Sequence, residues 1–312
     1  MKIFFCLVSL LFNFLIKFSK SENDEQRLSI GIPVMKITDE NLLKHKPELR
    51  GKSYIAASYV KFVELAGSRA VAITPNLSDN QLNTIFNSIN GLLFPGGNVN
   101  LVDSKYYYLT KRLAEMASKL NDEGIHFPIL GICRGMQALV KHSKELMVPT
   151  DSQNFTSSLK WHKESPLFRN SFYLIKKDTE LYNITSHFHQ YSFLPTISIN
   201  TTFDVIATSI DRKGKEFVSI IQDRTLPFYG VQFHPEKILF EWAPTIAIPH
   251  NSKAVRFSQS IANGFMDEAR KNNHSFKSYL DENNFTLVRQ NPIYIGDFLD
   301  SHSPFVQIYT FP

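Results

Sequence analysis

Short apolar runs alternate with segments of helical spacing through the first half of the chain. The runs predict buried strands at 28–33, 70–74, 91–94 and 127–132. Between them, apolar residues three and four apart predict helices near 55–63, 82–89 and 109–120. Ser78 and Gln81 offer a capping box for the second helix. The alternation predicts an α/β fold, a doubly wound and mostly parallel sheet flanked by helices, with a ligand crevice at the carboxyl ends of its strands.

The pattern is less regular elsewhere. Residues 39–53 are polar and predict a surface loop. Residues 151–203 combine short aromatic runs with little helical periodicity, which predicts loops and short strands near the mouth of the site. The remaining predicted elements are a hairpin over 204–223, a strand over 228–236, a helix over 253–272 and an irregular aromatic tail from 291.

One motif carries a candidate nucleophile, at residues 127–137, with the sequence FPILGICRGMQ. An apolar strand closes on Gly131, Cys133 follows, and Gly135 precedes residues that suit a helix. A nucleophile on such a strand-turn-helix elbow stands clear of the sheet edge, and flanking glycines allow the tight backbone. The alternative is a small buried cysteine in a plain connection, because free cysteines are commonly buried and inert.

A second motif, at residues 228–236, has the sequence FYGVQFHPE. If the strand continues to its end, His234 and Glu236 point to one face, and Pro235 is tolerated because pairing is finishing. A histidine that deprotonates a thiol needs a partner that fixes its tautomer and stabilises the imidazolium, and a same-face carboxylate supplies one. This motif is weak alone and much stronger together with the elbow cysteine.

The turn Pro95-Gly96-Gly97 follows the third predicted strand. Two glycines at the carboxyl end of a strand free backbone N–H groups to point at an anion, so the turn is a candidate for half of an oxyanion hole. The alternative is an ordinary turn.

The amino terminus indicates export. Lys2 precedes an apolar run from Ile3 to Ile16, which is too short for a comfortable membrane span and favours a signal peptide over residues 1–20. Residues 21–312 are then expected to form one domain. The formal charge of +5 falls to +2 when the three lysines of the signal are removed. Without a basic stripe, neither nucleic acid nor, after cleavage, a membrane is an expected partner.

The number and positions of the cysteines and of the N-glycosylation sequons agree with export. Cys6 lies in the expected signal, so the mature chain holds one thiol, Cys133, and no internal disulfide. In an oxidising compartment a solitary thiol is a liability unless it is buried or used, which favours a nucleophile. Six sequons are candidate N-glycosylation sites: Asn76, Asn154, Asn183, Asn200, Asn273 and Asn284.

Three motifs together resemble the class I glutamine amidotransferase superfamily: GICRG at 131–135, FPGG at 94–97 and YGVQFHPE at 229–236. Other stretches resemble one branch, the gamma-glutamyl hydrolases of peptidase family C26: SYIAASYV at 53–60, SINGLLFPGG at 88–97, HPEK at 234–237 with EW at 241–242, DEARKNNH at 267–274 and PIY at 292–294. The resemblance covers about residues 28–297 and implies a flavodoxin-like α/β fold.

The resemblance also implies roles for site residues. It makes Cys133 the nucleophile, His234 the acid and base, and Glu236 the carboxylate that orients the histidine. The backbone N–H groups of Arg134 and Gly97 would form the oxyanion hole. No metal or organic cofactor is implied.

Two further residues match the family. His189 resembles a second active-site histidine that positions substrate, and the alternative is a partly buried polar residue in an aromatic loop. Tyr54 matches a substrate-pocket tyrosine, and the alternative is packing at the start of a helix.

The chain departs from the family beside the nucleophile. Familiar gamma-glutamyl hydrolases carry a leucine after the cysteine and an acidic residue two beyond the next glycine, where this chain has Arg134 and Gln137. GICRG is closer to bacterial hydrolases of small gamma-glutamyl amides. The backbone donor survives the change, so only substrate preference is affected. The Arg134 side chain could bind a substrate carboxylate, lower the pKa of the thiol, or pair with a neighbouring acid.

The resulting hypothesis is a secreted or lysosomal (vacuolar) thiol hydrolase that cuts gamma-glutamyl isopeptide bonds, most readily those of folylpoly-gamma-glutamates. The alternatives are a hydrolase of small gamma-glutamyl amides, a glutaminase subunit that feeds a synthetase, and a non-catalytic binding protein on the same fold. The absence of a fused synthetase domain and the signal peptide disfavour the second. The intact cysteine, histidine and glutamate disfavour the third. The resemblance suggests a homodimer.

Overall fold

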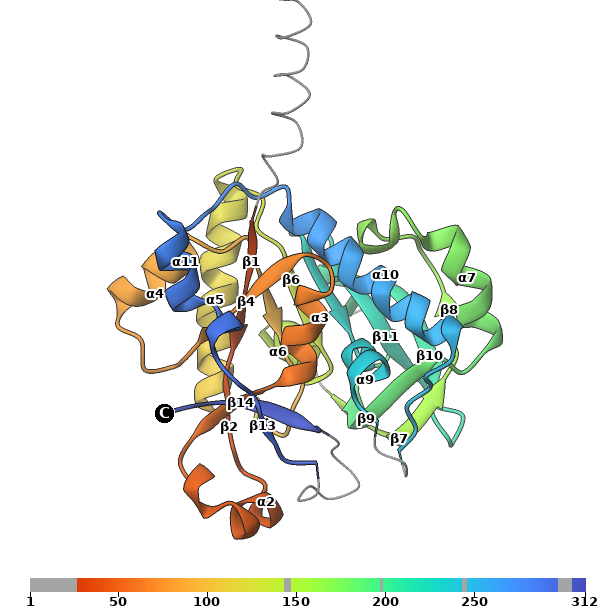
Figure 1. Cartoon of the computed structure of the whole chain (residues 1–312). Coiled ribbons are helices and arrows are strands. Elements are labelled where there is room, and N and C mark those ends of the chain that lie inside the picture. The colour runs from red at the N-terminus through yellow and green to blue at the C-terminus, as the bar shows by residue number, and fades with distance from the viewer. Residues whose placement is uncertain (1–26, 143–146, 197–198, 243–245, 297–304) are drawn as a thin grey trace, which may run out of the picture.

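The computed structural model describes residues 27–142, 147–196, 199–242, 246–296 and 305–312, so the expected signal peptide lies outside it. An eight-stranded sheet in the order β4-β1-β5-β6-β12-β11-β10-β8 forms the centre of the molecule (Figure 1). Its strands are β4 (Ser68–Ile73), β1 (Leu28–Pro33), β5 (Gly91–Phe94), β6 (Ile129–Ile132), β12 (Phe228–Val231), β11 (Glu216–Asp223), β10 (Phe203–Ile210) and β8 (Lys160–Trp161).

The sheet is parallel on one side and antiparallel on the other. Strands β4, β1, β5, β6 and β12 run parallel, and β11, β10 and β8 continue the sheet antiparallel. Every residue of β1, β5 and β6 is buried, as expected for strands covered on both faces. The prediction of a doubly wound, mostly parallel sheet is confirmed, and the predicted hairpin forms β10 and β11.

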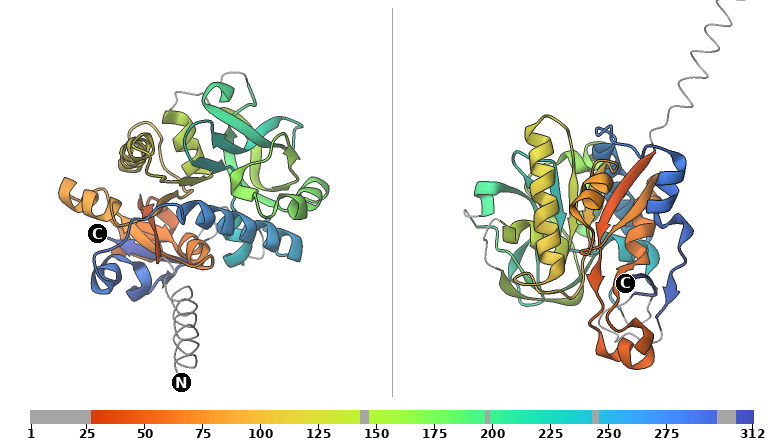
Figure 2. Two further views of the ribbon diagram at one scale, coloured as in Figure 1. Left: turned by 90° about the horizontal axis from the view of Figure 1, so that it is seen from above. Right: turned by 90° about the vertical axis from the view of Figure 1, so that its left-hand side faces the viewer.

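Helices cover both faces of the sheet, as the two views in Figure 2 show. One face carries α4 (Asp79–Phe86), α5 (Lys105–Asp122) and α6 (Arg134–His142), and the other carries α3 (Ala57–Glu64), α9 (Pro235–Phe240) and α10 (Ser252–Ala269). The capping box of α4 is confirmed, since the Ser78 hydroxyl accepts from the N–H of Gln81 and the Gln81 side chain accepts from the N–H of Ser78. The last predicted helix is confirmed as α10.

The region predicted as loops and short strands contains more structure than expected. Strands β7 (Val148–Ser157) and β9 (Thr185–Ser192) form a separate antiparallel pair. Between them lie η2 (Pro166–Phe168) and α7 (Phe172–Leu181), and α8 (Ile199–Thr202) follows. Helix α7 was missed because Tyr173 and Leu174, 82% and 80% exposed, add apolar residues to its solvent side and blur the helical period.

Two other predictions are wrong. Residues 39–53 contain α2 (Glu40–His45) and η1 (Pro47–Leu49), with Leu42, Leu43 and Leu49 buried. The tail is not irregular where it is described, because β13 (Ile293–Tyr294) and β14 (Gln307–Phe311) join β3 (Ser53–Ala56) and β2 (Met35–Lys36) in a four-stranded sheet. Its central pairing joins residues 53–56 to residues 308–311, which no local pattern reveals.

The strand predicted over 228–236 ends at Val231, before the histidine. His234 is the N-cap of α9, and Pro235 occupies the first helical position, where its fixed φ and missing N–H suit a helix. The remaining elements are α11 (Tyr279–Phe285) and η3 (Leu287–Arg289). Within the described residues, no helix is long and apolar enough to span a membrane.

Candidate active site

Cys133 lies on the predicted elbow, between the last residue of β6 and the first residue of α6. Its φ is 51°, in the left-handed region, and its N–H donates to the carbonyl of Val231 at 2.7 Å. A non-glycine residue with positive φ is uncommon and marks a backbone held by its surroundings. The side chain is 6% exposed and forms no disulfide. The elbow places this thiol at the carboxyl edge of the parallel strands, as predicted.

Gly135 explains the glycine pattern of the elbow. A Cβ on this residue would lie 1.9 Å from the carbonyl oxygen of Phe94. Helix α6 therefore packs directly against the end of β5, the strand that leads into the Pro-Gly-Gly turn. Only glycine allows this approach, which brings Cys133 and Gly97 to one pocket.

His234 and Glu236 form a buried pair. Nδ1 of His234 lies 2.7 Å from Oε1 of Glu236, and the two side chains are 3% and 0% exposed. The pairing was predicted from a continuous strand, and that reasoning is wrong. A turn into α9 brings the side chains together, with Glu236 in the first turn of the helix. Because Nδ1–H donates to the carboxylate, Nε2 is left for the thiol.

The electrostatics favour an ion pair between thiolate and imidazolium. Burial alone would lower the pKa of His234, but the carboxylate of Glu236 and the neighbouring Cys133 raise it to about 9. Burial alone would raise the pKa of the Cys133 thiol, but His234 and then Arg134 bring it below its usual value. A thiolate is the nucleophilic form of cysteine, so the site favours the reactive state.

Tyr59 supports the same site from α3. Its hydroxyl accepts from the N–H of Gly96 at 2.8 Å and lies 3.4 Å from Nδ1 of His234. A Cβ on Gly96 would come within 3.0 Å of the Tyr59 hydroxyl, Cε1 of His234 and Cβ of Cys133. These three side chains therefore converge on a position that only glycine can occupy. The sequence pattern indicated only a core position for Tyr59.

The two backbone groups named for the oxyanion hole are available. Among the described residues, neither the N–H of Gly97 nor that of Arg134 has an acceptor. Arg134 begins α6, so its N–H belongs to the first turn, whose donors have no partner inside the helix. Both residues line the same pocket as Cys133.

That pocket has a volume of about 500 Å³. The described residues that line it are Gly97, Asn98, Cys133, Arg134, Gln137, Gln153, Phe188, His189, Gln190, Tyr191, His234, Lys237 and Phe305. They include no carboxylate. Lys237 is buried, with Nζ 3.9 Å from the ring centroid of Phe305, and burial lowers its pKa. Lys237 directly follows the HPE motif, but nothing local predicts that Phe305 reaches the pocket.

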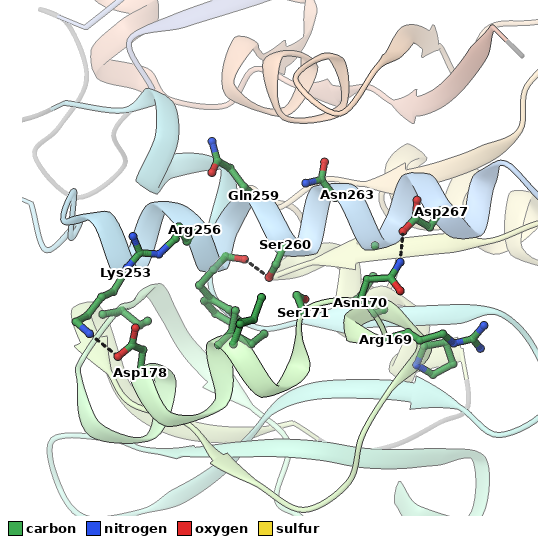
Figure 3. A pocket seen from close by; sticks show the side chains of 17 residues that line it. Arg169, Asn170, Ser171, Asp178, Lys253, Arg256, Gln259, Ser260, Asn263 and Asp267 are labelled. Carbon is green, nitrogen blue, oxygen red and sulfur yellow. Dashed lines mark hydrogen bonds and ion pairs between the residues drawn. The ribbon is translucent and has the colours of Figure 1, made fainter. Parts of the chain in front are cut away.

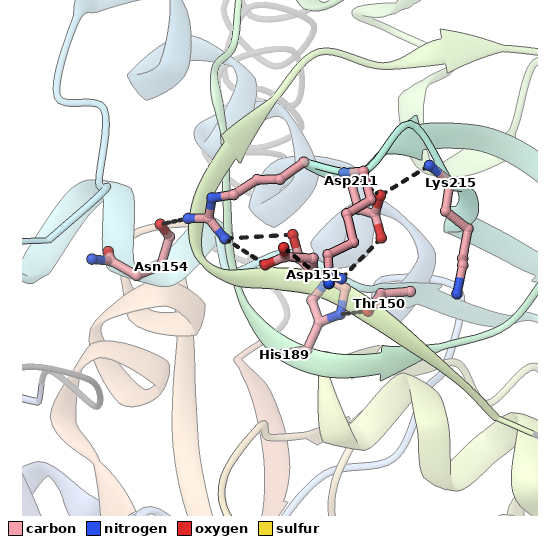
Figure 4. Close-up of polar contacts among 8 residues, drawn as sticks. Thr150, Asp151, Asn154, His189, Asp211 and Lys215 are labelled. Carbon is pink, nitrogen blue, oxygen red and sulfur yellow. Dashed lines mark hydrogen bonds and ion pairs between the residues drawn. The ribbon is translucent and has the colours of Figure 1, made fainter.

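His189 lies in the pocket wall with both ring nitrogens engaged. Nδ1 lies 3.2 Å from the Thr150 hydroxyl, and Nε2 lies 3.1 Å from Nδ1 of His187. Figure 4 shows His189 and Thr150 beside a polar cluster in which Asp211 accepts from the N–H of Asp151 at 2.9 Å. Burial is the main cause that lowers the pKa of His189, to about 3.

Hydrogen-bond direction fixes the tautomers along this chain. The single hydroxyl hydrogen of Thr185 is donated to the carbonyl of Ser157, so its oxygen can only accept from Nε2–H of His187. Nδ1 of His187 is then bare and accepts from Nε2–H of His189. His189 is thereby a neutral Nε2–H imidazole that accepts from Thr150.

Tyr54 lies next to the pocket and does not line it. It stands on β3 in an adjoining cavity with Asn98 and Phe305, and its ring centroid is 6.0 Å from that of Phe305. Burial raises its pKa to about 12. A Cβ on Gly97 would lie 3.3 Å from the Tyr54 hydroxyl, so this hydroxyl stands beside the glycine turn.

A second groove lies between α7 and α10 (Figure 3), with a volume of about 320 Å³. Ion pairs and amides cross it, including Lys253 with Asp178 and Asn170 with Asp267. The described residues that line it include neither a cysteine nor a histidine, so the chemistry of the sequence motifs lies elsewhere. Among the described residues, no group of three or more His, Cys, Asp or Glu side chains could hold a metal ion.

The sequons differ in accessibility. Asn76, Asn183, Asn273 and Asn284 are exposed. Asn154 is half-buried with φ 51°, and its side chain accepts from the N–H of Ala247 at 2.7 Å, which makes it the least suited of these five to carry a glycan. The side chain of Asn200 lies outside the described residues.

Fold and site together define a class: an α/β protein with the layout of a thiol hydrolase, whose cysteine stands on an elbow and whose histidine is paired with a glutamate. The model of the family Peptidase C26 matches residues 30–236. The gamma-glutamyl hydrolase of Mus musculus is 37% identical over 274 residues, 84% of each chain, and that of Homo sapiens is 35% identical over 271 residues, also 84% of each. Gamma-glutamyl hydrolase B of Dictyostelium discoideum is 33% identical over 273 residues, 84% of this chain and 78% of its own. The chain belongs to the peptidase C26 family.

Proposed function

We propose that this chain is a gamma-glutamyl hydrolase that cleaves gamma-glutamyl isopeptide bonds through Cys133, His234 and Glu236. The observation that carries the proposal is the buried His234–Glu236 pair, 2.7 Å apart, beside a cysteine whose pKa is lowered. Membership of the peptidase C26 family and the names of its relatives support the same reaction.

The reaction has two halves. The Cys133 thiolate attacks the gamma-carbonyl carbon, and the N–H groups of Gly97 and Arg134 bind the oxyanion. The imidazolium of His234 gives its proton to the leaving amine as the C–N bond breaks, which leaves a gamma-glutamyl thioester. His234 then takes a proton from water, and the hydroxide attacks the thioester, which frees the Cys133 thiolate and the donor with its gamma-carboxylate. With a folylpoly-gamma-glutamate this donor is the shortened folate, and the glutamate or glutamyl peptide has already left as the amine. Glu236 holds the imidazole in one tautomer throughout.

The substrate class follows from the pocket. Its described wall carries Arg134 and Lys237 and no carboxylate, which suits a substrate with several negative charges. We propose folylpoly-gamma-glutamates as the substrate. A small gamma-glutamyl amide is the second candidate, because Arg134 follows the nucleophile as in the bacterial hydrolases of such amides.

Incubation of the purified protein with pteroylpentaglutamate, beside a small gamma-glutamyl amide, tests the assignment when the products are resolved by chain length. Release of glutamate or shorter folates is expected, and Cys133→Ala is expected to abolish it while the melting temperature stays near that of wild type. Turnover by a folded Cys133→Ala protein would refute the mechanism. If the protein turns over only the amide, a small gamma-glutamyl amide replaces folylpoly-gamma-glutamates as the proposed substrate.

The same proposal includes secretion of the protein and its assembly as a homodimer. An apolar segment at residues 3–16 and four exposed sequons support cleavage of a signal after about residue 20 and delivery of one domain, 21–312, to the outside or a lysosome. A homodimer is proposed from the family resemblance alone. Expression in a eukaryotic secretory host, with a mass shift after deglycosylation, and sedimentation of the product check these points.

A further inference from the structure

The mechanism above uses the backbone N–H of Arg134 and the charge of its guanidinium, which helps to lower the pKa of the Cys133 thiol, but it gives the guanidinium no contact with the substrate. It lies on the first turn of α6, beside Cys133, and lines the same pocket. Nη1 donates to Oε1 of Gln137 at 2.8 Å, and Nε donates to the carbonyl of Gly97 at 3.5 Å. A guanidinium has five N–H donors, so these two bonds leave three, both of those on Nη2 among them, without an acceptor in the described structure.

No acid neutralises this guanidinium among the described residues. None of the ion pairs there includes Arg134, although fourteen other basic side chains form them. The described pocket wall has no Asp or Glu. A half-buried cation without a counter-charge, in a concave site, attracts anions from solution.

Gln137 fixes where the guanidinium points. Its side chain is 1% exposed, and Nε2 donates to the carbonyl of Tyr191 at 2.7 Å and to Oε1 of Gln232 at 3.2 Å. Both amide hydrogens are thus used within the protein, so the amide oxygen must face Arg134. Oε1 of Gln232 also lies 3.2 Å from the hydroxyl of Ser192, whose one hydrogen is shared between this oxygen and the carbonyl of Val218. A buried chain of hydrogen bonds therefore orients Arg134 before any ligand arrives.

We propose that the side chain of Arg134, held by Gln137, binds a carboxylate of the substrate by a paired hydrogen bond. This inference rests on the proposed function. A planar guanidinium matches a carboxylate with two parallel N–H donors, and preorganisation lowers the entropy cost of the contact. Two carboxylates could be bound. Every gamma-glutamyl donor carries one on its α-carbon, and a glutamyl leaving group carries others.

Two substrates distinguish the donor carboxylate from the carboxylates of the leaving group. Gamma-glutamyl-4-nitroanilide has a single carboxylate, on the donor, whereas gamma-glutamylglutamate carries additional carboxylates on the leaving group. Arg134→Gln is expected to raise KM by about ten- to a hundredfold, with a smaller change in kcat, because a hydrogen bond to a charged partner is lost. A rise with both substrates assigns the donor carboxylate. A rise with gamma-glutamylglutamate alone assigns the leaving group.

Three further variants test the charge of Arg134, its orientation by Gln137 and the specificity of the effect. Arg134→Lys keeps the charge but loses the two parallel N–H donors of the guanidinium. Its KM is expected to lie between those of wild type and Arg134→Gln. Gln137→Met keeps Arg134 but removes the amide that orients it, and is expected to raise KM by a smaller factor than Arg134→Gln. Arg112→Gln removes an arginine that pairs with Asp79 on the surface and does not line the pocket, and is expected to leave KM unchanged. Each variant is first checked by its melting temperature.

Protection of Cys133 from iodoacetamide by free glutamate gives a readout that needs no turnover. The protection constant of wild type is expected to weaken at least tenfold in Arg134→Gln. If wild type hydrolyses neither of these substrates nor pteroylpentaglutamate, the proposed function fails, and protection by glutamate still reports on the anion site. If wild type hydrolyses either substrate while folded Arg134→Gln keeps its KM and its protection constant, the Arg134 site is refuted and the proposed function stands.

Discussion

Nδ1 of His234 lies 2.7 Å from Oε1 of Glu236, and the histidine is the residue that begins the helix on which the glutamate sits. The helix start therefore fixes both partners, with Pro235 between them. Because Glu236 is fully buried, its charge acts on His234 through a medium of low polarity, where a charged partner counts for more than in water.

Glu236→Gln is expected to lower kcat by about a hundredfold or more, because the amide keeps the shape but no longer stabilises the imidazolium. The pKa of His234 should fall from about 9 toward or below its usual value. The pH profile of kcat/KM measures this as a lost or displaced alkaline limb. Glu48→Gln, at an exposed carboxylate on η1, is the matched control and should change neither. An unaltered profile in Glu236→Gln would contradict the assigned role.

Cys133 is expected to hold a larger thiolate fraction at neutral pH than a free cysteine, because His234 lowers the pKa of its thiol. Iodoacetamide should alkylate the native protein at pH 6.5 faster than a free cysteine peptide. In His234→Asn the pKa should rise, and the alkylation rate at pH 6.5 should fall about tenfold for each unit of the rise. The difference should disappear at high pH, where both proteins are fully thiolate. A rate that does not depend on His234 would show that another group activates the thiol.

Tyr59→Phe is expected to destabilise the fold and lower kcat together. It removes the acceptor of the buried Gly96 N–H, and an unpaired buried donor costs about 1–3 kcal/mol. The turn that carries Gly97 should then be less well held, so the oxyanion donor loses its position. Urea unfolding and kcat measure the two effects. Tyr108→Phe, at a tyrosine that is 59% exposed, is the control. A stability loss without any loss of kcat would make Tyr59 a purely structural residue.

Much of the fold could be predicted because its signals are local. Most strands and helices between residues 28 and 142 follow from apolar period and caps, although α2, η1, β2 and β3 do not. Cys133 follows from one glycine-flanked motif. The pairing of His234 with Glu236 was predicted correctly from a wrong geometry, since strand continuation and a proline-started helix both bring residues two apart together.

The rest depends on contacts between distant segments. Strand β14 exists because β3 offers it an edge, and Phe305 reaches the pocket only through that strand. The orientation of Arg134 depends on the carbonyl of Tyr191, which belongs to β9. Tyr59 has the pattern of a core residue, and only its distance to Gly96 indicates a place in the site. None of these relationships leaves a periodic trace in the sequence.

His187 and His189 are expected to be neutral Nε2–H tautomers over pH 5–8, because the Thr185 hydroxyl can only accept from His187 and burial lowers the pKa of both rings. Long-range proton–nitrogen NMR distinguishes the two tautomers by their nitrogen shifts. In His187→Leu the Nε2–H of His189 loses its acceptor, so His189 should change to the Nδ1–H tautomer and donate to Thr150 instead. His162→Leu changes an exposed histidine whose Nε2 contacts a different threonine, Thr208, and should leave both signals in place. A wild-type His189 that titrates near its ordinary pKa, or that carries its proton on Nδ1, would overturn the direction assigned to the whole hydrogen-bond chain.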